Sequence, residues 1–215
     1  MSLPRQEAKN EDANPRVAQI RDALGSRSLV LIGLMGAGKS SVGKRLAGTL
    51  CLPFTDADNE IEAAAGQNIE EIFADHGEAY FREGERKVIA RLLGNGPQVL
   101  ATGGGAYMDA ETRNRIAESG LSIWLRAELP VLMKRVRRRN NRPLLATGDP
   151  KETMQKLMDK RYPVYSQADL VVETRDAPHD TVVGEIVAML YEHLFSETTR
   201  PGTSRSPKGN PRKGK

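Results

Sequence analysis

Short apolar runs and longer amphipathic stretches alternate along most of the chain. The apolar runs have the length and composition of strands buried on both faces of a sheet, and they predict strands at residues 28–32, 53–56, 98–102, 121–125 and 170–173. Between these runs, apolar positions recur at the spacing of a helix face. They predict helices at residues 39–50, 69–93 with a break near Gly77, 110–118, 130–138, 151–162 and 181–194. This alternation predicts a three-layer α/β fold, in which a parallel five-stranded sheet carries helices on both faces.

The two ends of the chain do not follow this alternation. Residues 1–27 are mostly polar and are predicted to form a flexible N-terminal extension, although apolar positions from Val17 to Leu24 have the spacing of a short helix. Residues 196–215 are rich in Gly, Pro, Ser, Thr, Arg and Lys and are predicted to form a basic, disordered tail. One domain at residues 28–195 remains. The chain has no apolar stretch long enough to span a membrane, so no membrane association is expected.

The net charge of +4 comes from the C-terminal tail. Residues 196–215 contain six basic residues and one acidic residue, so the rest of the chain is slightly acidic. The tail has no aromatic residue on which bases could stack, and a nucleic-acid partner is therefore not expected. The only cysteine, Cys51, excludes an intramolecular disulfide and is typical of a protein in the reducing cytoplasm.

Residues 33–40 contain the most specific motif of the chain. Their sequence, Gly-Leu-Met-Gly-Ala-Gly-Lys-Ser, has the pattern of a phosphate loop. The loop joins a predicted strand to a predicted helix, whose free N–H groups and dipole favour anions. Gly36 and Gly38 would allow a positive φ and a close approach of the backbone to phosphate. Lys39 is predicted to reach the β- and γ-phosphates of a nucleoside triphosphate, and Ser40 to bind Mg²⁺ directly.

Two carboxylates, Asp56 and Asp58, stand at the end of the second predicted strand. Residues two apart in a strand face the same side, so we expect both to lie near the triphosphate. One would bind metal-bound water and the other the acceptor hydroxyl. The alternative for Asp58 is a cap for a helix that begins at the next residues.

Further candidate residues follow the third predicted strand and lie in the long predicted helix. Gly103, Gly104 and Gly105 are successive glycines at a strand end. Such glycines are expected where a ligand or another backbone comes close, the alternative being a flexible turn. Arg82 and Glu85 are three residues apart and can pair on one helix face.

Together these motifs resemble those of the shikimate kinase family. Residues 28–195 carry, in this order, the phosphate loop, Asp56-x-Asp58, Phe81-Arg82-x-x-Glu85, Thr102-Gly103-Gly104-Gly105, Arg142-Pro143-Leu144-Leu145 and Arg161-x-x-x-Tyr165. The resemblance implies a P-loop kinase fold similar to the nucleoside monophosphate kinases, in which the polar, basic residues 137–149 form a mobile lid. It also implies a monomer that phosphorylates the 3-hydroxyl of shikimate with ATP and Mg²⁺, in aromatic amino-acid biosynthesis.

The resemblance assigns roles to individual residues. It implies catalysis by Lys39, Asp58 and Arg142. It implies ATP binding by Gly36, Ala37, Gly38, Lys39, Ser40, Ser41, Arg138 and Arg142. It implies shikimate binding by Asp58, Arg82, Gly103, Gly104, Gly105 and Arg161. The metal would be bound directly by Ser40 and through water by Asp56. Glu85 would orient Arg82, and Arg138 would stack on adenine, with Arg135 as the alternative and Pro178 beside the base.

Other functions remain open from the sequence. A related small-metabolite kinase, such as one for gluconate, would share the phosphate loop and the lid. A nucleoside monophosphate kinase would show more base and phosphate contacts in its acceptor segment. A nucleotide-dependent switch or scaffold would use the basic tail for partners. The chain has no Asn-Lys-x-Asp guanine signature, and its acceptor-site residues favour a transfer enzyme.

Overall fold

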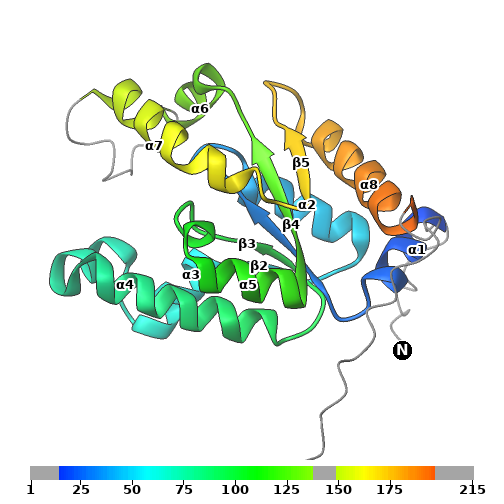
Figure 1. Ribbon diagram of the computed structural model, residues 1–215, viewed down its shortest axis with the longest axis horizontal. Helices are drawn as coiled ribbons and strands as arrows, with labels where there is room; N and C mark the ends of the chain where they lie inside the picture. Colours follow the sequence, from blue (N-terminus) through cyan, green and yellow to red (C-terminus); the bar gives the residue numbers. More distant parts are fainter. Residues whose placement is uncertain (1–14, 138–148, 197–215) are drawn as a thin grey trace, which may run out of the picture.

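A parallel five-stranded sheet forms the centre of the computed structural model, which describes residues 15–137 and 149–196. Its strands are β1 (Ser28–Ile32), β2 (Phe54–Asp56), β3 (Val99–Ala101), β4 (Gly120–Arg126) and β5 (Leu170–Glu173), in the spatial order β2-β3-β1-β4-β5 (Figure 1). All neighbouring strands are parallel. Every residue of β1 is buried, as expected for a strand covered on both faces.

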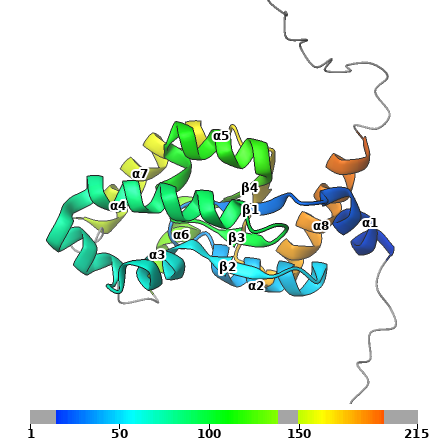
Figure 2. The same cartoon turned by 90° about the horizontal axis from the view of Figure 1, so that it is seen from below.

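Helices cover both faces of this sheet, which confirms the predicted three layers (Figure 2). One face carries α1 (Pro15–Leu24), α2 (Lys39–Leu50) and α8 (His179–Ser196), and the other carries α4 (Ile69–Leu93) and α5 (Ala110–Ser119). The remaining helices are α3 (Ala57–Ala65), α6 (Leu129–Val136), α7 (Pro150–Tyr165) and the short 3₁₀ helix η1 (Ala106–Met108). No helix within the described ranges combines the length and the apolar character that a membrane span requires.

The 3₁₀ helix η1 has no counterpart among the predicted elements, and α3 corresponds only to the alternative in which a helix follows Asp58. Helix α3 starts directly after β2, where the Asp56 carboxylate caps it by accepting the backbone N–H of Asp58 at 3.2 Å. A strand of three residues followed at once by a helix leaves no apolar period long enough to detect in the sequence. The other predicted strands and helices are confirmed, with boundaries that shift by up to three residues.

The long helix α4 has the predicted break at Gly77, whose φ of 79° and ψ of 176° are not helical. A capping box between Asn68 and Glu71 begins the half before the break. The half after it carries Arg82 and Glu85 to the cleft described below. The kink thus divides α4 into two halves, and residues of both halves line the cleft.

Helix α7 continues three residues beyond its predicted end at Tyr162. Proline removes a donor from a helix interior, yet the helix passes through Pro163 and ends at Tyr165. Tyr162 and Tyr165 bury this last turn against Trp124, with ring centroids 4.8 and 5.8 Å from the indole. Because the helix continues, Arg161 and Tyr165 lie one turn apart on the same face.

The short helix that the spacing from Val17 to Leu24 indicated is confirmed: the segment is helical and packed from residue 15, in contrast to a flexible extension up to residue 27. Three apolar side chains of α1, at Val17, Ile20 and Leu24, are buried, and the helix packs on α8 and α2. Burial of this apolar face stabilises the helix. The predicted tail lies outside the described residues, apart from Ser196.

Candidate active site

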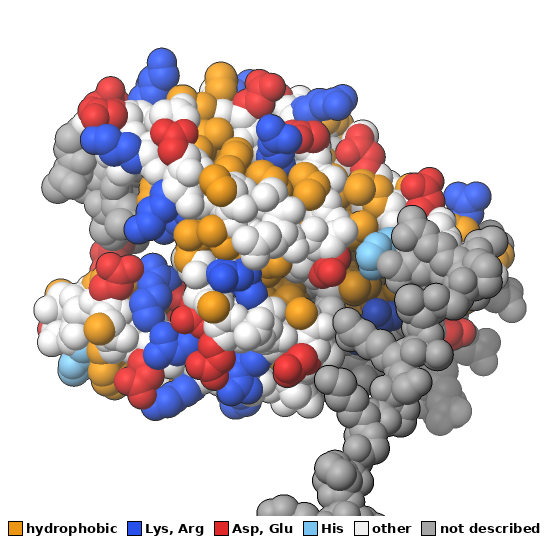
Figure 3. Space-filling view, viewed as in Figure 1, with side chains coloured by type: hydrophobic (Ala, Val, Ile, Leu, Met, Phe, Trp, Pro, Cys, Tyr) orange, Lys and Arg blue, Asp and Glu red, His pale blue; other side chains and the backbone are white. Residues whose placement is uncertain are grey.

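A cleft of about 1200 Å³ opens at the carboxyl ends of the strands. In parallel sheets, ligands bind beyond the carboxyl ends of the strands, where the strand order reverses. In this sheet the reversal is at β1, which has β3 on one side and β4 on the other. Residues after β1, β2, β3 and β5 line the cleft, together with residues of α4, α6 and α7. The molecular surface is hollowed between α4 and α7, and basic side chains gather at the edge of this hollow (Figure 3).

The phosphate loop lies after the central strand of the sheet, between β1 and α2. Gly36 has a φ of 82° and Gly38 a φ of 99°, conformations that an L side chain would strain, so the predicted positive φ is confirmed. Gly38 is also the N-cap of α2. The first N–H groups of a helix have no partner within it, and a phosphate at this point would meet them together with the positive end of the helix dipole.

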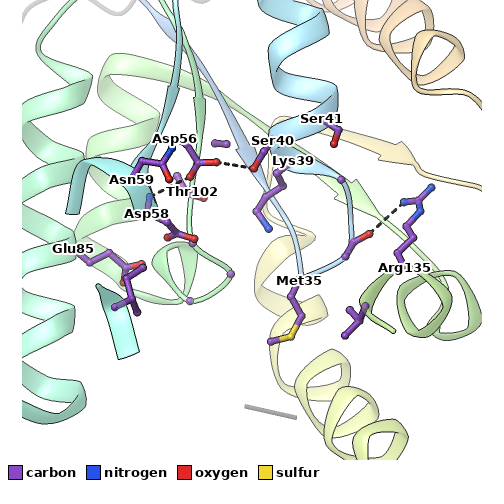
Figure 4. A pocket seen from close by; sticks show the side chains of 18 of the residues that line it. Met35, Lys39, Ser40, Ser41, Asp56, Asp58, Asn59, Glu85, Thr102 and Arg135 are labelled. Carbon is purple, nitrogen blue, oxygen red and sulfur yellow. Dashed lines mark hydrogen bonds between the residues drawn. The ribbon is translucent and has the colours of Figure 1, made fainter. Parts of the chain in front are cut away.

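Lys39 and Ser40 begin α2 and project toward the cleft (Figure 4). The Lys39 Nζ donates to the carbonyl oxygens of Gly33 and Leu34, at 2.9 and 3.1 Å. The Ser40 hydroxyl donates to Asp56 Oδ2 at 2.6 Å. The structure therefore places the lysine, the serine and the first carboxylate of the predicted site beside one another.

A metal ion at this position would have few protein ligands. The described part of the chain contains no group of three or more His, Cys, Asp or Glu side chains that could hold an ion. Mg²⁺ keeps several waters and is usually held by one or two protein oxygens together with phosphates. The adjacent oxygens of Ser40 and Asp56 fit an ion that arrives with a nucleotide.

The two predicted carboxylates belong to different elements, so the interpretation of Asp56 and Asp58 as a pair on one strand is wrong. Strand β2 ends at Asp56, and Asp58 lies in the first turn of α3. The helix cap is Asp56, so the capping alternative applies to that residue and not to Asp58. Both residues still line the cleft. The Asp58 carboxylate points into it from the side opposite Lys39 (Figure 4).

Arg82 and Glu85 form the predicted ion pair on α4. Arg82 Nη1 lies 2.7 Å from Glu85 Oε2, and Nη2 lies 3.2 Å from Glu78 Oε1. Glu85 is buried, and its Oε1 has no hydrogen-bond partner among the described residues. Burial raises the pKa of Glu85 above its ordinary value, while the positive charge of Arg82 opposes this shift. The pair holds the Arg82 guanidinium at the wall of the cleft.

The three successive glycines leave room for charged side chains. A Cβ on Gly103 would lie 2.8 Å from Glu85 Oε1 and 3.0 Å from Asp58 Oδ1. A Cβ on Gly105 would lie 2.4 Å from Arg82 Nη1. The sequence predicts that a ligand or another backbone approaches these glycines closely. In the structure, the groups that approach are the carboxylates and the guanidinium of the site.

Arg161 reaches the same glycines from α7. Its Nη1 donates to the carbonyl oxygen of Gly104 at 2.9 Å, and the hydroxyl of Tyr165 donates to the same oxygen. Asp58, Arg82 and Arg161 therefore approach one turn from three different helices. The sequence indicated Arg161 only through the family resemblance. The hydrogen bond of Tyr165 was not predicted, because its only signal was membership of the Arg161-x-x-x-Tyr165 motif.

The other end of the cleft lies beside the phosphate loop and α6. Arg135 Nη1 donates to the carbonyl oxygens of Gly36 and Ala37, at 3.4 and 3.3 Å (Figure 4). Arg135 was the alternative residue for adenine stacking. The preferred residue, Arg138, and the predicted lid arginine, Arg142, lie outside the described residues.

The segment after β5 completes this end of the cleft with Asp176, Ala177, Pro178 and His179. Of these, only Pro178 was predicted. Burial lowers the pKa of His179, and the positive charges of Arg45 and Arg135 act in the same direction. The position of the segment after the carboxyl end of a parallel strand is the sequence signal that indicates it.

The phosphate loop lies at the N-terminus of a helix, and carboxylates and arginines lie across the same cleft. This arrangement defines a P-loop phosphotransferase. A family model described as "Shikimate kinase" matches residues 35–191. The chain belongs to the shikimate kinase family.

Two curated relatives and one solved structure show the extent of this similarity. A shikimate kinase of Bradyrhizobium diazoefficiens is 59% identical over 180 residues, which cover 84% of this chain and 87% of that protein. One of Rhodopseudomonas palustris is 54% identical over 188 residues, covering 87% and 93%. The structure of a shikimate kinase from Acinetobacter baumannii in complex with shikimate matches with a TM-score of 0.74 at 31% identity, covering 84% of this chain and 99% of that one. The predicted family and P-loop kinase fold are confirmed.

Proposed function

We propose that the protein transfers the γ-phosphoryl group of ATP to the 3-hydroxyl of shikimate, giving shikimate 3-phosphate and ADP. One observation carries this proposal: Lys39 and Asp58 point into one cleft from opposite sides. Arg82 and Arg161 lie at the end of the cleft away from Arg135 and Pro178, which we call the acceptor end. Shikimate has one carboxylate and three hydroxyls. The planar guanidinium groups of the arginines can form paired hydrogen bonds with the carboxylate. An aspartate can accept hydrogen bonds from the hydroxyls.

At the nucleotide end, the free N–H groups at the start of α2 would bind the phosphates, and Lys39 would neutralise charge on the β- and γ-phosphates. Lys39 would exchange its present bonds to loop carbonyls for phosphate oxygens. Ser40 would bind Mg²⁺ directly and Asp56 through water, and the ion would supply positive charge at the phosphates. Arg135 and Pro178 line the part of the cleft where adenine would lie. Arg138 and Arg142 remain predictions for the lid.

At the acceptor end, Arg82 and Arg161 would bind the carboxylate of shikimate, and the backbone at Gly104 would contact the ring. Asp58 would accept the hydrogen bond of the attacking hydroxyl and take up its proton. The bond from this oxygen to the γ-phosphorus forms as the bond to the β–γ bridging oxygen breaks. Such a transfer passes through a loose transition state and depends mainly on positioning and charge neutralisation.

We also infer a cytoplasmic location. Cys51, the single cysteine of the chain, is free and exposed. Unpaired thiols are kept reduced in that compartment, whereas oxidising compartments favour disulfides.

A coupled ADP-release assay tests the acceptor. We expect ADP release with ATP, Mg²⁺ and shikimate, and only background release when gluconate or a nucleoside monophosphate replaces shikimate. The reason is that neither gluconate nor a nucleoside monophosphate has a carboxylate on a ring that two arginine guanidinium groups could bind together. Equal stimulation by gluconate would favour the small-metabolite kinase alternative. Background release with every acceptor, from a folded protein that binds ATP, would favour a switch or scaffold.

Replacing Gly105 by alanine is expected to raise the KM for shikimate about tenfold, the size of a charge-assisted contact that is weakened but not lost. The new Cβ would lie 2.4 Å from Arg82 Nη1 and 2.6 Å from Cζ, so the end of this side chain must move. The φ of Gly105, −98°, suits alanine, so the fold should be retained. Steady-state kinetics with varied shikimate measures the effect.

Gly84→Ala is the matched control for this substitution. Gly84 lies in α4 between the two partners of the ion pair, and a Cβ there would meet nothing within 4 Å. We expect an unchanged KM for shikimate and a slightly higher stability, since alanine favours helices by about 1 kcal/mol over glycine. A normal KM in Gly105→Ala would mean that the position of Arg82 does not matter for shikimate binding.

A further inference from the structure

The carbonyl oxygen of Gly104 accepts two hydrogen bonds from α7. Arg161 Nη1 donates to it at 2.9 Å, and the Tyr165 hydroxyl donates as well. A carbonyl oxygen has two lone pairs, so both acceptor positions are used. One of the two donors, Arg161, is also a residue that the proposed function needs for the carboxylate of the acceptor.

The Tyr165 ring is held by its surroundings. The residue is fully buried, and its ring centroid lies 5.8 Å from that of Trp124, 6.3 Å from Tyr162 and 6.4 Å from Tyr107. Burial raises the pKa of Tyr165 to about 12, against the opposing charge of Arg161. The hydroxyl is therefore protonated, and a donor, at every pH near neutrality.

The bond from Tyr165 fixes more than one atom of the glycine turn. A peptide group is planar, and the carbonyl and the next N–H of a trans peptide point in opposite directions. Among the described residues there is no cis peptide bond. Holding the carbonyl of Gly104 against α7 therefore also orients the N–H of Gly105. Both glycines line the acceptor end of the cleft.

We propose that Tyr165 is a positioning residue for the acceptor: its hydroxyl holds the Gly104–Gly105 peptide in place when Arg161 turns from the Gly104 carbonyl to the substrate. This inference rests on the proposed function, which assigns Arg161 to the carboxylate of shikimate. Without Tyr165, each binding event would leave the carbonyl of this half-buried turn without a protein partner, or would keep Arg161 on it. Either outcome weakens binding of the acceptor and leaves binding of ATP unchanged.

Tyr165→Phe removes only the hydroxyl and tests the proposal. We expect the KM for shikimate to rise about tenfold, the upper range for one hydrogen bond, with the KM for ATP within about twofold of wild type. Shikimate binding can also be followed directly by the fluorescence of Trp124, the only tryptophan, whose ring contacts Tyr165. The dissociation constant for shikimate should rise by the same factor as its KM.

Tyr162→Phe is the matched control. Tyr162 lies in the same aromatic cluster, and its hydroxyl also donates to a backbone carbonyl, that of Ala127, away from the residues that line the cleft. Both variants should lose a similar amount of thermal stability, and only Tyr165→Phe should shift the KM for shikimate. Equal shifts in both variants, or no shift in Tyr165→Phe, would overturn the proposal. If the wild-type protein does not phosphorylate shikimate, the proposed function fails, which the same assay shows before any variant is compared.

Discussion

Replacing Lys39 by alanine is expected to lower kcat about 1000-fold, because a preorganised charge at the transferring phosphoryl group supplies a large part of catalysis. The Nζ atom lies at the phosphate loop, 2.9 Å from the Gly33 carbonyl, and it faces the carboxylate of Asp58 across the cleft. Lys39→Met keeps the aliphatic stem without the charge and should give a loss of similar size. Initial rates at saturating ATP and shikimate measure both variants.

The control for this prediction is Lys44→Ala. Lys44 is an exposed lysine of the same helix, with its ammonium 5.9 Å from the ring centroid of Phe54, and it does not line the cleft. Its kcat should be that of wild type. Thermal unfolding followed by Trp124 fluorescence reports whether each variant is folded. Turnover close to wild type in folded Lys39→Ala would contradict the role of the phosphate loop in the reaction.

Replacing Arg82 by alanine is expected to raise the KM for shikimate about 100-fold and to leave the KM for ATP within about threefold. The charge-assisted bonds of one guanidinium to a carboxylate contribute about 3 kcal/mol when both are lost. Arg82→Lys should recover only part of the affinity, since an ammonium cannot form the paired bonds of a planar fork. Kinetics with each substrate varied in turn separate the two constants.

Arg86→Ala, one turn further along α4, is the control. Arg86 is half-exposed, pairs with Asp109 at 3.5 Å and does not line the cleft. Both KM values should be unchanged in this variant. An equal rise of the two KM values in Arg82→Ala would argue against a carboxylate clamp and for a general disturbance of the site.

Loss of Arg82 should also strengthen the dependence of stability on pH that comes from Glu85. The pKa of this buried carboxyl is already raised by burial, and without the opposing charge of Arg82 it rises further. The pKa of this carboxyl is higher in the folded than in the unfolded protein. The free energy of unfolding therefore falls as pH rises from the unfolded-state pKa through the folded-state pKa. The loss of stability of Arg82→Ala relative to wild type should therefore be smallest at acidic pH and should grow as pH rises. Adding Glu85→Gln should remove this pH dependence while the KM for shikimate stays high.

The features that the sequence predicted well depend on neighbouring residues. The phosphate loop is contiguous, and its glycines take a positive φ wherever a strand meets a helix in this way. The pair of Arg82 and Glu85 follows from the spacing of three residues on a helix. The break at Gly77 and the positions of the five strands follow from residue type and periodicity.

The features that the sequence missed depend on contacts between distant segments. The sequence pattern places Asp58 at the end of a strand, because the short β2 and the immediate start of α3 have no periodic signal of their own. The sequence pattern predicts that α7 ends before Pro163, because local propensity does not include the burial of two tyrosines on Trp124. The same added turn carries Tyr165 to the Gly104 carbonyl.

By itself, the sequence determined the order along the chain of the five strands and of most helices, the phosphate loop and, through the resemblance of its motifs, the family, since these follow from residue type and spacing along the chain. Only the tertiary structure decided which residues meet at the acceptor end. Asp58, Arg82 and Arg161 come from three helices, and they converge because residues 103–105 have no side chains to exclude them. Such convergence is a property of packing in three dimensions, which no window of the sequence contains.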